Sequence, residues 1–321
     1  MTRVAVLGAG AWGTAIAVVL AGRLDVTLWA RDPAQADAIA RTRRNERYLP
    51  KVELPAVVQV SADFPAKADL FLAATPVAGL REVLQRKKTP IVWLCKGFEQ
   101  GTGLLPHQMA EQTLGAGARC GALSGPSFAE EVARGLPCAL TLAARDAGFA
   151  REAAAIVHGG RLRVYYSADL VGVEIGGAVK NVMAIAAGIS DGLGLGYNAR
   201  AALITRGLAE IARLGAALGG SADTIFGLTG AGDLILTATG DLSRNRRVGM
   251  ELAQGKKLEP ILAALGHVAE GVQSAREVAK LAKARGIEMP VTDAVNAVLE
   301  GKLTPKAAVE QLLSRDAKQE R

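Results

Sequence analysis

The chain has 321 residues, of which 50% are hydrophobic and 21% are charged, and its formal net charge is +7. This length allows two domains with full cores, and this composition argues against a disordered chain. Three cysteines without a C-x-x-C spacing and three scattered histidines argue against a disulfide framework, a zinc site and a histidine-based catalytic triad, and they indicate free thiols in a reducing compartment.

The positive charge does not by itself indicate a nucleic-acid partner. Aromatic residues are only 4% of the chain, and no basic stretch is interleaved with them as a base-stacking platform requires. Phosphorylated small molecules explain the charge equally well. The uncharged segment 4–22 contains turn glycines and lacks a basic leader, which argues against a signal peptide or a membrane span. We therefore expect a cytoplasmic protein with no nucleic-acid partner and no stable membrane association.

The N-terminal segment has the order of a dinucleotide-binding unit. A β-branched run, 4–7, precedes a G-x-G-x-x-G motif, and an apolar helix-like stretch, 14–20, follows it. The glycines permit a tight turn, a close approach of the backbone to pyrophosphate and close packing of helix on strand. The helix N-terminus adds free N–H groups and a partial positive charge. We expect a nucleotide site that includes Gly8, Gly10, Ala11, Trp12 and Gly13.

Strand and helix signals alternate through the first half of the chain. Helices are expected after Asp32-Pro33, where Asp32 is a predicted N-cap, and after Thr75-Pro76. Further strands are predicted at 26–30, 57–60, 69–73, 91–94, 120–123, 139–143 and 162–166. This alternation predicts an α/β fold: a Rossmann-type, mostly parallel, doubly wound sheet over residues 1–167.

After residue 167 long amphipathic segments replace the short apolar runs. Helices are predicted at 170–189, 199–218, 229–238, 246–254, 271–285 and 290–300. The glycine-rich segment 190–196 lacks the lysine of a phosphate-binding P-loop, so we expect only a mobile connection there. The charged tail 314–321 is expected to fray. Residues 168–321 are thus predicted to form an all-helical substrate-binding domain.

Two lysines are candidates for a functional role. Lys180 lies in the small-residue segment GGAVKNVMAIAAG, and a buried lysine is costly unless it is paired or its pKa falls. Lys96 follows the strand 91–94, at the sheet edge where ligands bind. Two ammonium groups close together would each ease deprotonation of the other, which suits proton transfer near neutral pH.

The segment 227–249 combines an acid, a hydroxyl and a basic cluster. Asp233 and Thr237 are four residues apart, so on a helix they share one face and can point at one small ligand. Arg244 offers a planar fork of donors that suits phosphate, and Ser243 and Asn245 can complete the anion's hydrogen-bond shell. An isolated Ser-Arg-Asn would more often be a solvated turn, but the dinucleotide motif at the other end of the chain favours a phosphate-bearing ligand.

Seven blocks together resemble the bacterial NAD(P)-dependent glycerol-3-phosphate dehydrogenase family. They are GAGAWGTAIA, NERYLP, CKGFE, LSGPSFAEEVARG, GGAVKNVMAIAAG, GAGDLILTATGDLSRN and VAEGVQSAREV, in family order over nearly the whole chain. The resemblance implies reversible reduction of dihydroxyacetone phosphate to sn-glycerol 3-phosphate, which feeds phospholipid synthesis.

The resemblance also implies roles for individual residues. Lys180 matches the proton donor and acceptor, and we expect Asp233 to hold it in position. The implied substrate site contains Lys96, Gly125, Ser127, Lys180, Asp233, Ser243, Arg244 and Asn245. The implied cofactor contacts beyond the glycine motif are Tyr48, Lys96, Ala129, Arg244, Val268 and Glu270. Ser127 stands where many relatives carry threonine, which keeps the hydroxyl.

The end of the second predicted strand bears on the choice of cofactor. An NAD site usually has an acid there that binds the ribose 2′-hydroxyl. Here Ala30 occupies the strand end and cannot repel a phosphate, while Asp32 is accounted for as a helix cap. Arg31 is placed to pair with a 2′-phosphate. We therefore expect NADP(H) to be preferred, NAD(H) to be accepted, and no metal to be required.

Two other functions stay open from the residues alone. One is a different phosphate-bearing or β-hydroxyacid substrate on the same architecture, such as 6-phosphogluconate. The other is a nucleotide-binding redox sensor without catalysis, which has no need of a buried lysine and a phosphate anchor. The oligomeric state is also open, with a homodimer as one alternative.

Overall fold

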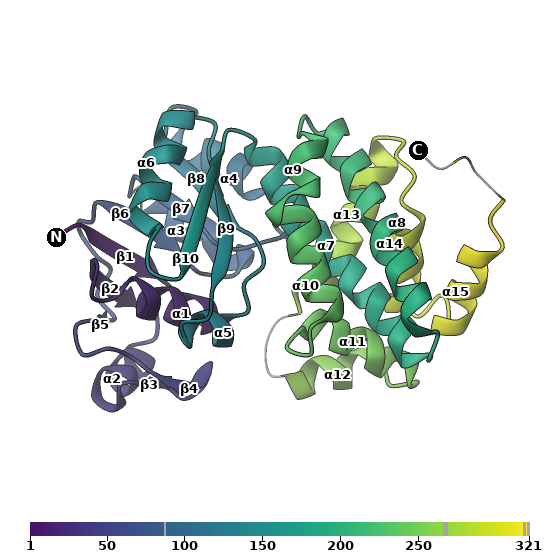
Figure 1. Ribbon diagram of the computed structural model, residues 1–321, viewed down its shortest axis with the longest axis horizontal. Helices are drawn as coiled ribbons and strands as arrows, with labels where there is room; N and C mark the ends of the chain where they lie inside the picture. Colours follow the sequence, from purple (N-terminus) through teal and green to yellow (C-terminus); the bar gives the residue numbers. More distant parts are fainter. Residues whose placement is uncertain (87, 266–268, 317–318, 320–321) are drawn as a thin grey trace. The chain divides into compact units, whose positions relative to one another are not determined.

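A computed structural model describes residues 1–86, 88–265, 269–316 and 319. They form two compact units, Met1–Glu174 and Ile175–Arg321 (Figure 1). Strands give way to helices after Ser167, as the sequence predicts, but the units divide within helix α7 (Leu170–Gly192). The division lies later than the predicted domain boundary because Leu170 and Val173, in the first turns of α7, pack into the apolar core of the first unit.

The first unit is built on one eight-stranded sheet with the order β10-β9-β8-β7-β6-β1-β2-β5. All neighbouring strands are parallel except β8 and β9, so the prediction of a mostly parallel sheet is confirmed. The strands are β1 (Arg3–Leu7), β2 (Asp25–Trp29), β5 (Gln59–Ser61), β6 (Leu70–Ala73), β7 (Ile91–Trp93), β8 (Cys120–Ser124), β9 (Cys138–Ala143) and β10 (Leu162–Ser167).

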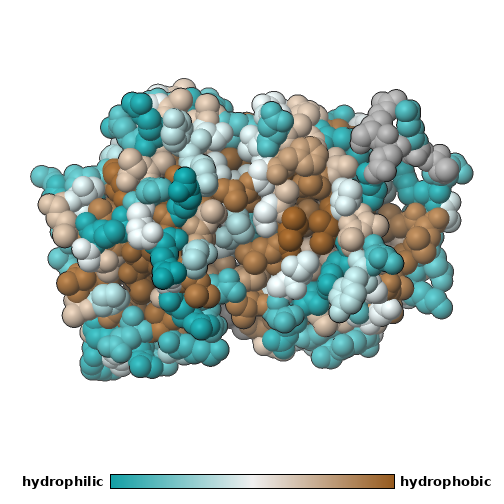
Figure 2. Space-filling model, viewed as in Figure 1, coloured by the Kyte–Doolittle hydropathy of each residue, from teal (hydrophilic) through white to brown (hydrophobic). Residues whose placement is uncertain are grey.

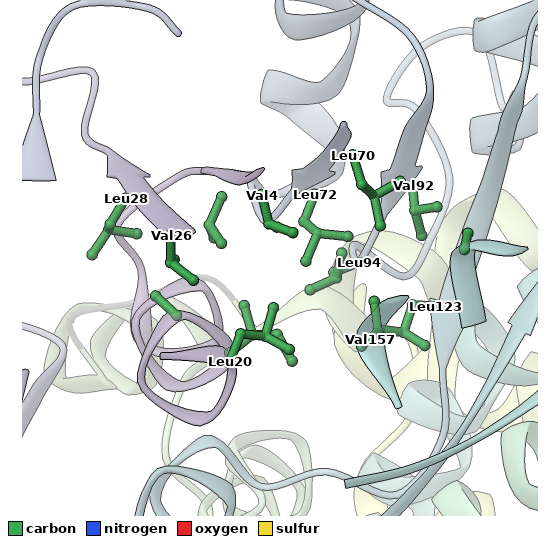
Figure 3. Close-up of a cluster of buried hydrophobic side chains, with 14 of the residues drawn as sticks. Val4, Leu20, Val26, Leu28, Leu70, Leu72, Val92, Leu94, Leu123 and Val157 are labelled. Carbon is green, nitrogen blue, oxygen red and sulfur yellow. The ribbon is translucent and has the colours of Figure 1, made fainter. Parts of the chain in front are cut away.

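Each face of the sheet contributes to an apolar core. Successive side chains of a strand point to opposite sides, so one strand supplies residues to both cores. In β1, Val4 and Val6 join one apolar cluster, whereas Ala5 and Leu7 join another. Figure 3 shows the first cluster, in which side chains of the strands face Leu20. The helices that contribute to it are α1 (Ala11–Leu20), α2 (Pro33–Thr42) and α6 (Ala147–Val157). The second cluster is covered by α3 (Val77–Gln85), α4 (Pro106–Leu114) and the start of α7.

The strand order reverses beside β1. The chain passes from β1 outward to β2 and β5, then returns to the other side of β1 to form β6. The carboxyl ends of β1 and β6 are therefore neighbours, and the crevice outside such a reversal is where open α/β sheets bind ligands. Gly8 follows β1 at this edge, and Ala74 follows β6.

A short antiparallel hairpin was not predicted. It consists of β3 (Arg44–Asn45) and β4 (Leu49–Glu53), which overlap the block NERYLP at residues 45–50. A two-residue strand carries no readable alternation, which is why the sequence pattern missed it. Between β8 and β9 lies α5 (Ala129–Ala133).

The second unit is helical, as predicted. After α7 it contains α8 (Gly196–Ala217), α9 (Ala222–Phe226), η1 (Leu228–Gly232), α10 (Asp233–Thr239), α11 (Arg244–Ala253), α12 (Leu258–Leu265), α13 (Glu270–Ala284), α14 (Pro290–Leu299) and α15 (Pro305–Leu313). Within the described residues, α7 alone is long and apolar enough to cross a membrane by length and composition, and 94% of its apolar stretch is buried in the fold. Figure 2 shows apolar side chains on the surface of both units.

Two details of the second unit differ from the predictions. The single helix predicted over 229–238 is a π-helical turn, η1, followed by α10. The predicted glycine-rich connection at 190–196 is shorter, because α7 continues to Gly192 and α8 begins at Gly196. The glycines of α7 serve packing: a Cβ on Gly188 would lie 2.0 Å from the carbonyl oxygen of Arg246, and one on Gly192 2.7 Å from the Cβ of Ala253.

A buried carboxylate caps one helix of the second unit. Glu210, in α8, is 1% exposed and accepts hydrogen bonds from the backbone N–H of Val291 at 2.7 Å, from that of Thr292 at 3.2 Å and from the Thr292 hydroxyl at 3.1 Å. These donors belong to the first turn of α14, whose N–H groups need such a partner. Burial raises the pKa of Glu210 to about 7.

This raised pKa predicts a pH-dependent stability. Because the folded chain holds the Glu210 proton more tightly than the unfolded chain does, the free energy of unfolding should fall as pH rises from about 4.5 to about 7. The contribution is at most about 3 kcal/mol, and Glu210→Gln should remove it. Urea unfolding of both proteins at pH 5 and pH 8 measures the effect. An equal stability difference between wild type and variant at both pH values would contradict it.

Candidate functional site

The glycine-rich turn of the first unit has the geometry of an anion site. Gly8 has φ +122°, and a Cβ there would stand 2.9 Å from the carbonyl oxygen of Ala74. A Cβ on Gly13 would overlap the carbonyl oxygen of Gly8 at 1.9 Å, whereas one on Gly10 would meet nothing within 4 Å. The outer glycines thus serve the turn and the helix packing, and the middle one leaves open space beside the backbone. Gly10 is the N-cap of α1, and no side chain accepts a hydrogen bond from the first turn of the helix. The backbone N–H groups of that turn, which includes Ala11 and Trp12, can therefore donate to a pyrophosphate.

Residues from the hairpin and from α5 surround α1. Trp12 and Ala129 both pack against a small apolar cluster formed by Ala15, Leu49, Val52 and Ala133. Tyr48 directly precedes Leu49, and the guanidinium of Arg47 lies 5.1 Å from the centre of its ring. The structure therefore brings Trp12, Tyr48 and Ala129, which sequence analysis assigned to the cofactor from distant segments, to the same part of the first unit.

The end of β2 presents a basic side chain. Arg31 is exposed and forms an ion pair with Glu82 at 3.4 Å, both side chains being largely in solvent. Such a pair is worth about 1 kcal/mol or less, so a phosphate can replace Glu82 at little cost. Asp32 accepts a hydrogen bond from the N–H of Ala34 at 3.0 Å, which confirms its predicted role as N-cap of α2.

Lys96, Gly125 and Ser127 meet at one backbone carbonyl. The Nζ of Lys96 donates to the carbonyl oxygen of Gly125 at 3.1 Å, and the Ser127 hydroxyl donates to the same oxygen at 3.0 Å. Lys96 follows β7 and Gly125 follows β8, and these parallel neighbours end at the same sheet edge. Gly125 has φ +139° and little space for a side chain, which explains the glycine.

In the second unit Lys180 is buried against an acid and a hydroxyl. Its Nζ donates to Oδ1 of Asp233 at 2.7 Å and to Oγ1 of Thr237 at 2.8 Å. The Thr237 hydroxyl in turn donates to the carbonyl oxygen of Asp233 at 2.6 Å. Lys180 is 7% exposed, Asp233 1% and Thr237 4%, so the whole group is shielded from water. The four-residue spacing of Asp233 and Thr237 on α10 does place them on one face. The expected contact of Asp233 with Lys180 is confirmed, and Thr237 meets the same ammonium, a partner that the spacing alone did not identify.

The energetics of this pair favour a chemical role. Desolvating two charges costs several kcal/mol, and a well-packed apolar pair in the same place is often at least as stable. Removing either partner alone would leave a buried charge without its counter-charge, at a cost of about 3–5 kcal/mol. Stability therefore does not explain why an ammonium occupies the middle of α7.

The amide of Asn245 is part of a buried network. Its Nδ2 donates to Oδ1 of Asn181 at 2.9 Å, and its Oδ1 accepts from the N–H of Gly271 at 3.1 Å. Asn181 also donates to Oε2 of Glu270, the first residue of α13, at 3.3 Å. The network joins the neighbour of Lys180 to two residues that sequence analysis assigned to the site. Asn181 itself was missed; its signal was an amide in an apolar helix directly after Lys180.

Ser243 and Arg244 begin helix α11 in different ways. The Ser243 side chain is buried and caps the helix by accepting from the N–H of Arg246 at 3.2 Å. Arg244 is exposed, and among the described residues no ion-pair partner is found for it. A guanidinium beside a helix N-terminus is a favourable place for a phosphate. Val268 lies outside the described residues.

The arrangement in the second unit can deliver a proton and hold an anion. An ammonium oriented by a carboxylate and a hydroxyl can act as a general acid. Across residues 1–86, 88–265, 269–316 and 319, no group of three or more His, Cys, Asp or Glu side chains is placed to hold a metal ion.

Comparisons with known proteins give one consistent result. Residues 3–150 match the family model described as NAD-dependent glycerol-3-phosphate dehydrogenase N-terminus, and residues 169–310 match the corresponding C-terminus model. The chain is 59% identical to a glycerol-3-phosphate dehydrogenase [NAD(P)+] of Dechloromonas aromatica, over 99% of each chain. A crystal structure of glycerol-3-phosphate dehydrogenase from Coxiella burnetii superposes with a TM-score of 0.92 at 42% identity, covering 98% of this chain and 99% of the other. The glycerol-3-phosphate dehydrogenase structure from Saccharomyces cerevisiae gives 0.81 at 28% identity, with 97% and 99% covered.

Proposed function

The chain belongs to the NAD-dependent glycerol-3-phosphate dehydrogenase family, and on that premise we propose how its own residues carry out the reaction. It is an NAD(P)-dependent oxidoreductase that interconverts dihydroxyacetone phosphate and sn-glycerol 3-phosphate. The observation that carries the assignment of residues is the buried contact of Lys180 with Asp233 and Thr237. A nucleotide-binding sensor without catalysis would have no use for a charge held at this cost.

Lys180 supplies the proton. When bound, the reduced nicotinamide supplies a hydride to the C2 carbon of dihydroxyacetone phosphate. The Lys180 ammonium gives its proton to the C2 oxygen, and in the reverse direction the neutral amine takes that proton back. Asp233 keeps the ammonium oriented and Thr237 restricts its position, so the donor needs no rearrangement during the reaction.

Arg244 anchors the substrate phosphate. Its guanidinium is exposed in the first turn of α11, where the helix dipole also favours an anion. Ser243 and Asn245 support this anchor because one caps α11 and the other ties it to Asn181. We also assign Lys96, Gly125 and Ser127, which meet at one backbone carbonyl, to substrate binding, and Lys96 to cofactor binding as well.

The remaining proposals concern the cofactor, the cellular compartment, the metabolic role and the assembly. The residues of the first unit fit a dinucleotide, with Gly8, Gly10, Ala11, Trp12 and Gly13 at the pyrophosphate and Tyr48 and Ala129 beside it. The family resemblance also assigns Glu270 and Val268 to cofactor binding. Arg31 favours NADP(H) over NAD(H), both being accepted. We assign the enzyme to the cytoplasm and to glycerol 3-phosphate supply for phospholipid synthesis, with a homodimer as one alternative for its assembly.

A substrate panel tests the activity. Purified enzyme should oxidise NADPH, followed by absorbance, with dihydroxyacetone phosphate and should give no turnover with 6-phosphogluconate in the reverse assay. Size-exclusion chromatography with light scattering measures the assembly separately. Turnover of 6-phosphogluconate alone would replace the proposed substrate, and no turnover of either would favour the sensor.

Lys180→Ala should lower kcat by about 10²–10⁴-fold, the usual contribution of a general acid, while cofactor affinity stays near that of the wild type. Steady-state rates and equilibrium cofactor binding measure the two effects. Lys280→Ala is the control, because Lys280 is an exposed lysine of the same unit. A loss of less than about tenfold would remove Lys180 from the acid role and make Lys96 the candidate.

Arg244→Ala should weaken turnover of dihydroxyacetone phosphate far more than that of unphosphorylated dihydroxyacetone. A charge-assisted hydrogen bond to phosphate is worth about 1.5–3 kcal/mol, and only the phosphorylated substrate loses it. The measurement is kcat/KM for both compounds. Arg247→Ala is the matched control, since Arg247 lies on the same helix, is 59% exposed and pairs with Glu251. Equal losses for both substrates would assign Arg244 to the cofactor or to the fold.

Arg31→Ala should raise KM for NADPH sharply and leave KM for NADH nearly unchanged, because only NADPH carries the 2′-phosphate. Arg41→Ala, an exposed arginine in the last turn of α2, serves as the control. A wild-type enzyme with a higher kcat/KM for NADH would speak against the preference and return Asp32 to the role of ribose ligand.

A further inference from the structure

The glycine-rich turn is supported by side chains from outside its own segment. The carbonyl oxygen of Ala9, between the first two glycines, accepts a hydrogen bond from Nδ2 of Asn45 at 2.9 Å and another from Nε2 of Gln35 at 2.8 Å. Asn45 is 1% exposed, so its amide is a buried part of the first unit. A buried side chain of β3 therefore fixes the backbone of the glycine-rich turn at Ala9.

Asn45 also reaches the helix that follows the turn. The same Nδ2 donates to the hydroxyl of Thr14 at 2.7 Å, and Thr14 is fully buried near the start of α1. An amide nitrogen has two hydrogens, and here one goes to the turn and the other to the helix. Asn45 thus sets the position of the Ala9 carbonyl relative to α1, which is the geometry on which a pyrophosphate site at a helix N-terminus depends.

The backbone of Asn45 organises the neighbouring loop as well. Its carbonyl oxygen accepts from the N–H of Tyr48 at 3.2 Å, which closes the turn between β3 and β4. Leu49 and Val52 of β4 pack with Ala15 of α1 and with Ala133 of α5. The hairpin is therefore attached to α1 twice, by apolar packing and by the Asn45 amide.

We propose that Asn45 is a positioning residue of the dinucleotide site: it holds the glycine-rich turn and the first turns of α1 in the arrangement that binds pyrophosphate. This inference rests on the proposed use of a nicotinamide dinucleotide. Asn45 has its two amide hydrogens on Ala9 and Thr14, so it acts through the turn and not on the reacting atoms. Preorganising a binding loop from a rigid neighbour lowers the cost of binding.

The test is equilibrium binding of NADPH, NADH and ADP-ribose to the full chain by titration calorimetry. Asn45→Ala should raise Kd about tenfold for all three ligands, because all three carry the pyrophosphate. Asn45→Asp, which keeps the shape but cannot donate, should do the same. Arg44→Ala is the control: Arg44 is the neighbouring strand residue, its ion pair with Glu53 lies across the hairpin, and its removal should leave Kd unchanged. At saturating cofactor, the kcat of the two Asn45 variants should stay near the wild-type value, because Asn45 does not contact the reacting atoms.

A second pair of variants keeps the inference testable where Asn45 variants do not fold. Thr14→Val removes the hydroxyl that Asn45 contacts and should raise Kd in the same direction by about threefold, whereas Thr14→Ser keeps the hydroxyl and should restore it. Unchanged Kd with a lower unfolding midpoint would make Asn45 purely structural and overturn the inference. A rise in Kd for NADPH and NADH, with the Kd for ADP-ribose unchanged, would also overturn the inference. A wild type that binds dinucleotide but does not reduce dihydroxyacetone phosphate would overturn the proposed function and leave the role of Asn45 standing.

Discussion

The ion pair between Lys180 and Asp233 is the interaction on which the proposed chemistry of the second unit depends. It exists because helix packing is unusually close around it. A Cβ on Gly176 of α7 would lie 2.8 Å from the carbonyl oxygen of Thr229, and a Cβ on Gly230 would overlap the carbonyl oxygen of Ile225 at 1.9 Å. These glycines allow the π-helical turn η1 to lie against α7, so that Asp233, the residue after η1, comes within 2.7 Å of the lysine. Irregular turns of this kind recur at functional sites because they shift the helix face that follows them.

The two proposed phosphate sites, one in each unit, are built in different ways. In the first unit the backbone N–H groups at the start of α1 supply the donors, because Gly10 caps the helix without a side chain and leaves open space beside it. In the second, Ser243 already satisfies one N–H at the start of α11, and the positive charge comes from the Arg244 side chain. A backbone site suits a pyrophosphate that lies along a turn, whereas a guanidinium on a helix suits a terminal phosphate that is approached from solvent.

Buried asparagine amides fix the backbone around both proposed phosphate sites. Asn45 holds the glycine-rich turn, and Asn245 and Asn181 join α7, α11 and the start of α13. Each of these side chains makes its hydrogen bonds inside one unit, which makes it costly to move. A motif such as Ser243-Arg244-Asn245 therefore combines two kinds of residue. Arg244 is exposed and able to meet a ligand, while the residues on either side of it fix the helix from which it extends.

Local patterns in the sequence were sufficient for most of the elements and for several local contacts. The alternation of strands and helices, the turn at Gly8, the cap at Asp32 and the shared face of Asp233 and Thr237 all depend on residues a few positions apart, so their spacing could be read directly. The placement of Lys96 at a sheet edge followed from the strand before it. The contact of Lys180 with Asp233, 53 residues apart, was expected from the family resemblance and is confirmed. Only the tertiary structure decided that Thr237 contacts the same lysine and that Asn45 meets Ala9, 36 residues away. The hairpin at β3 and β4, the π-helical turn and the helical packing of the glycines at 188 and 192 were likewise decided there. The physical reason is that local propensity depends on neighbours in the chain, whereas a buried hydrogen bond or ion pair depends on the path of the whole backbone and on the space that close packing leaves.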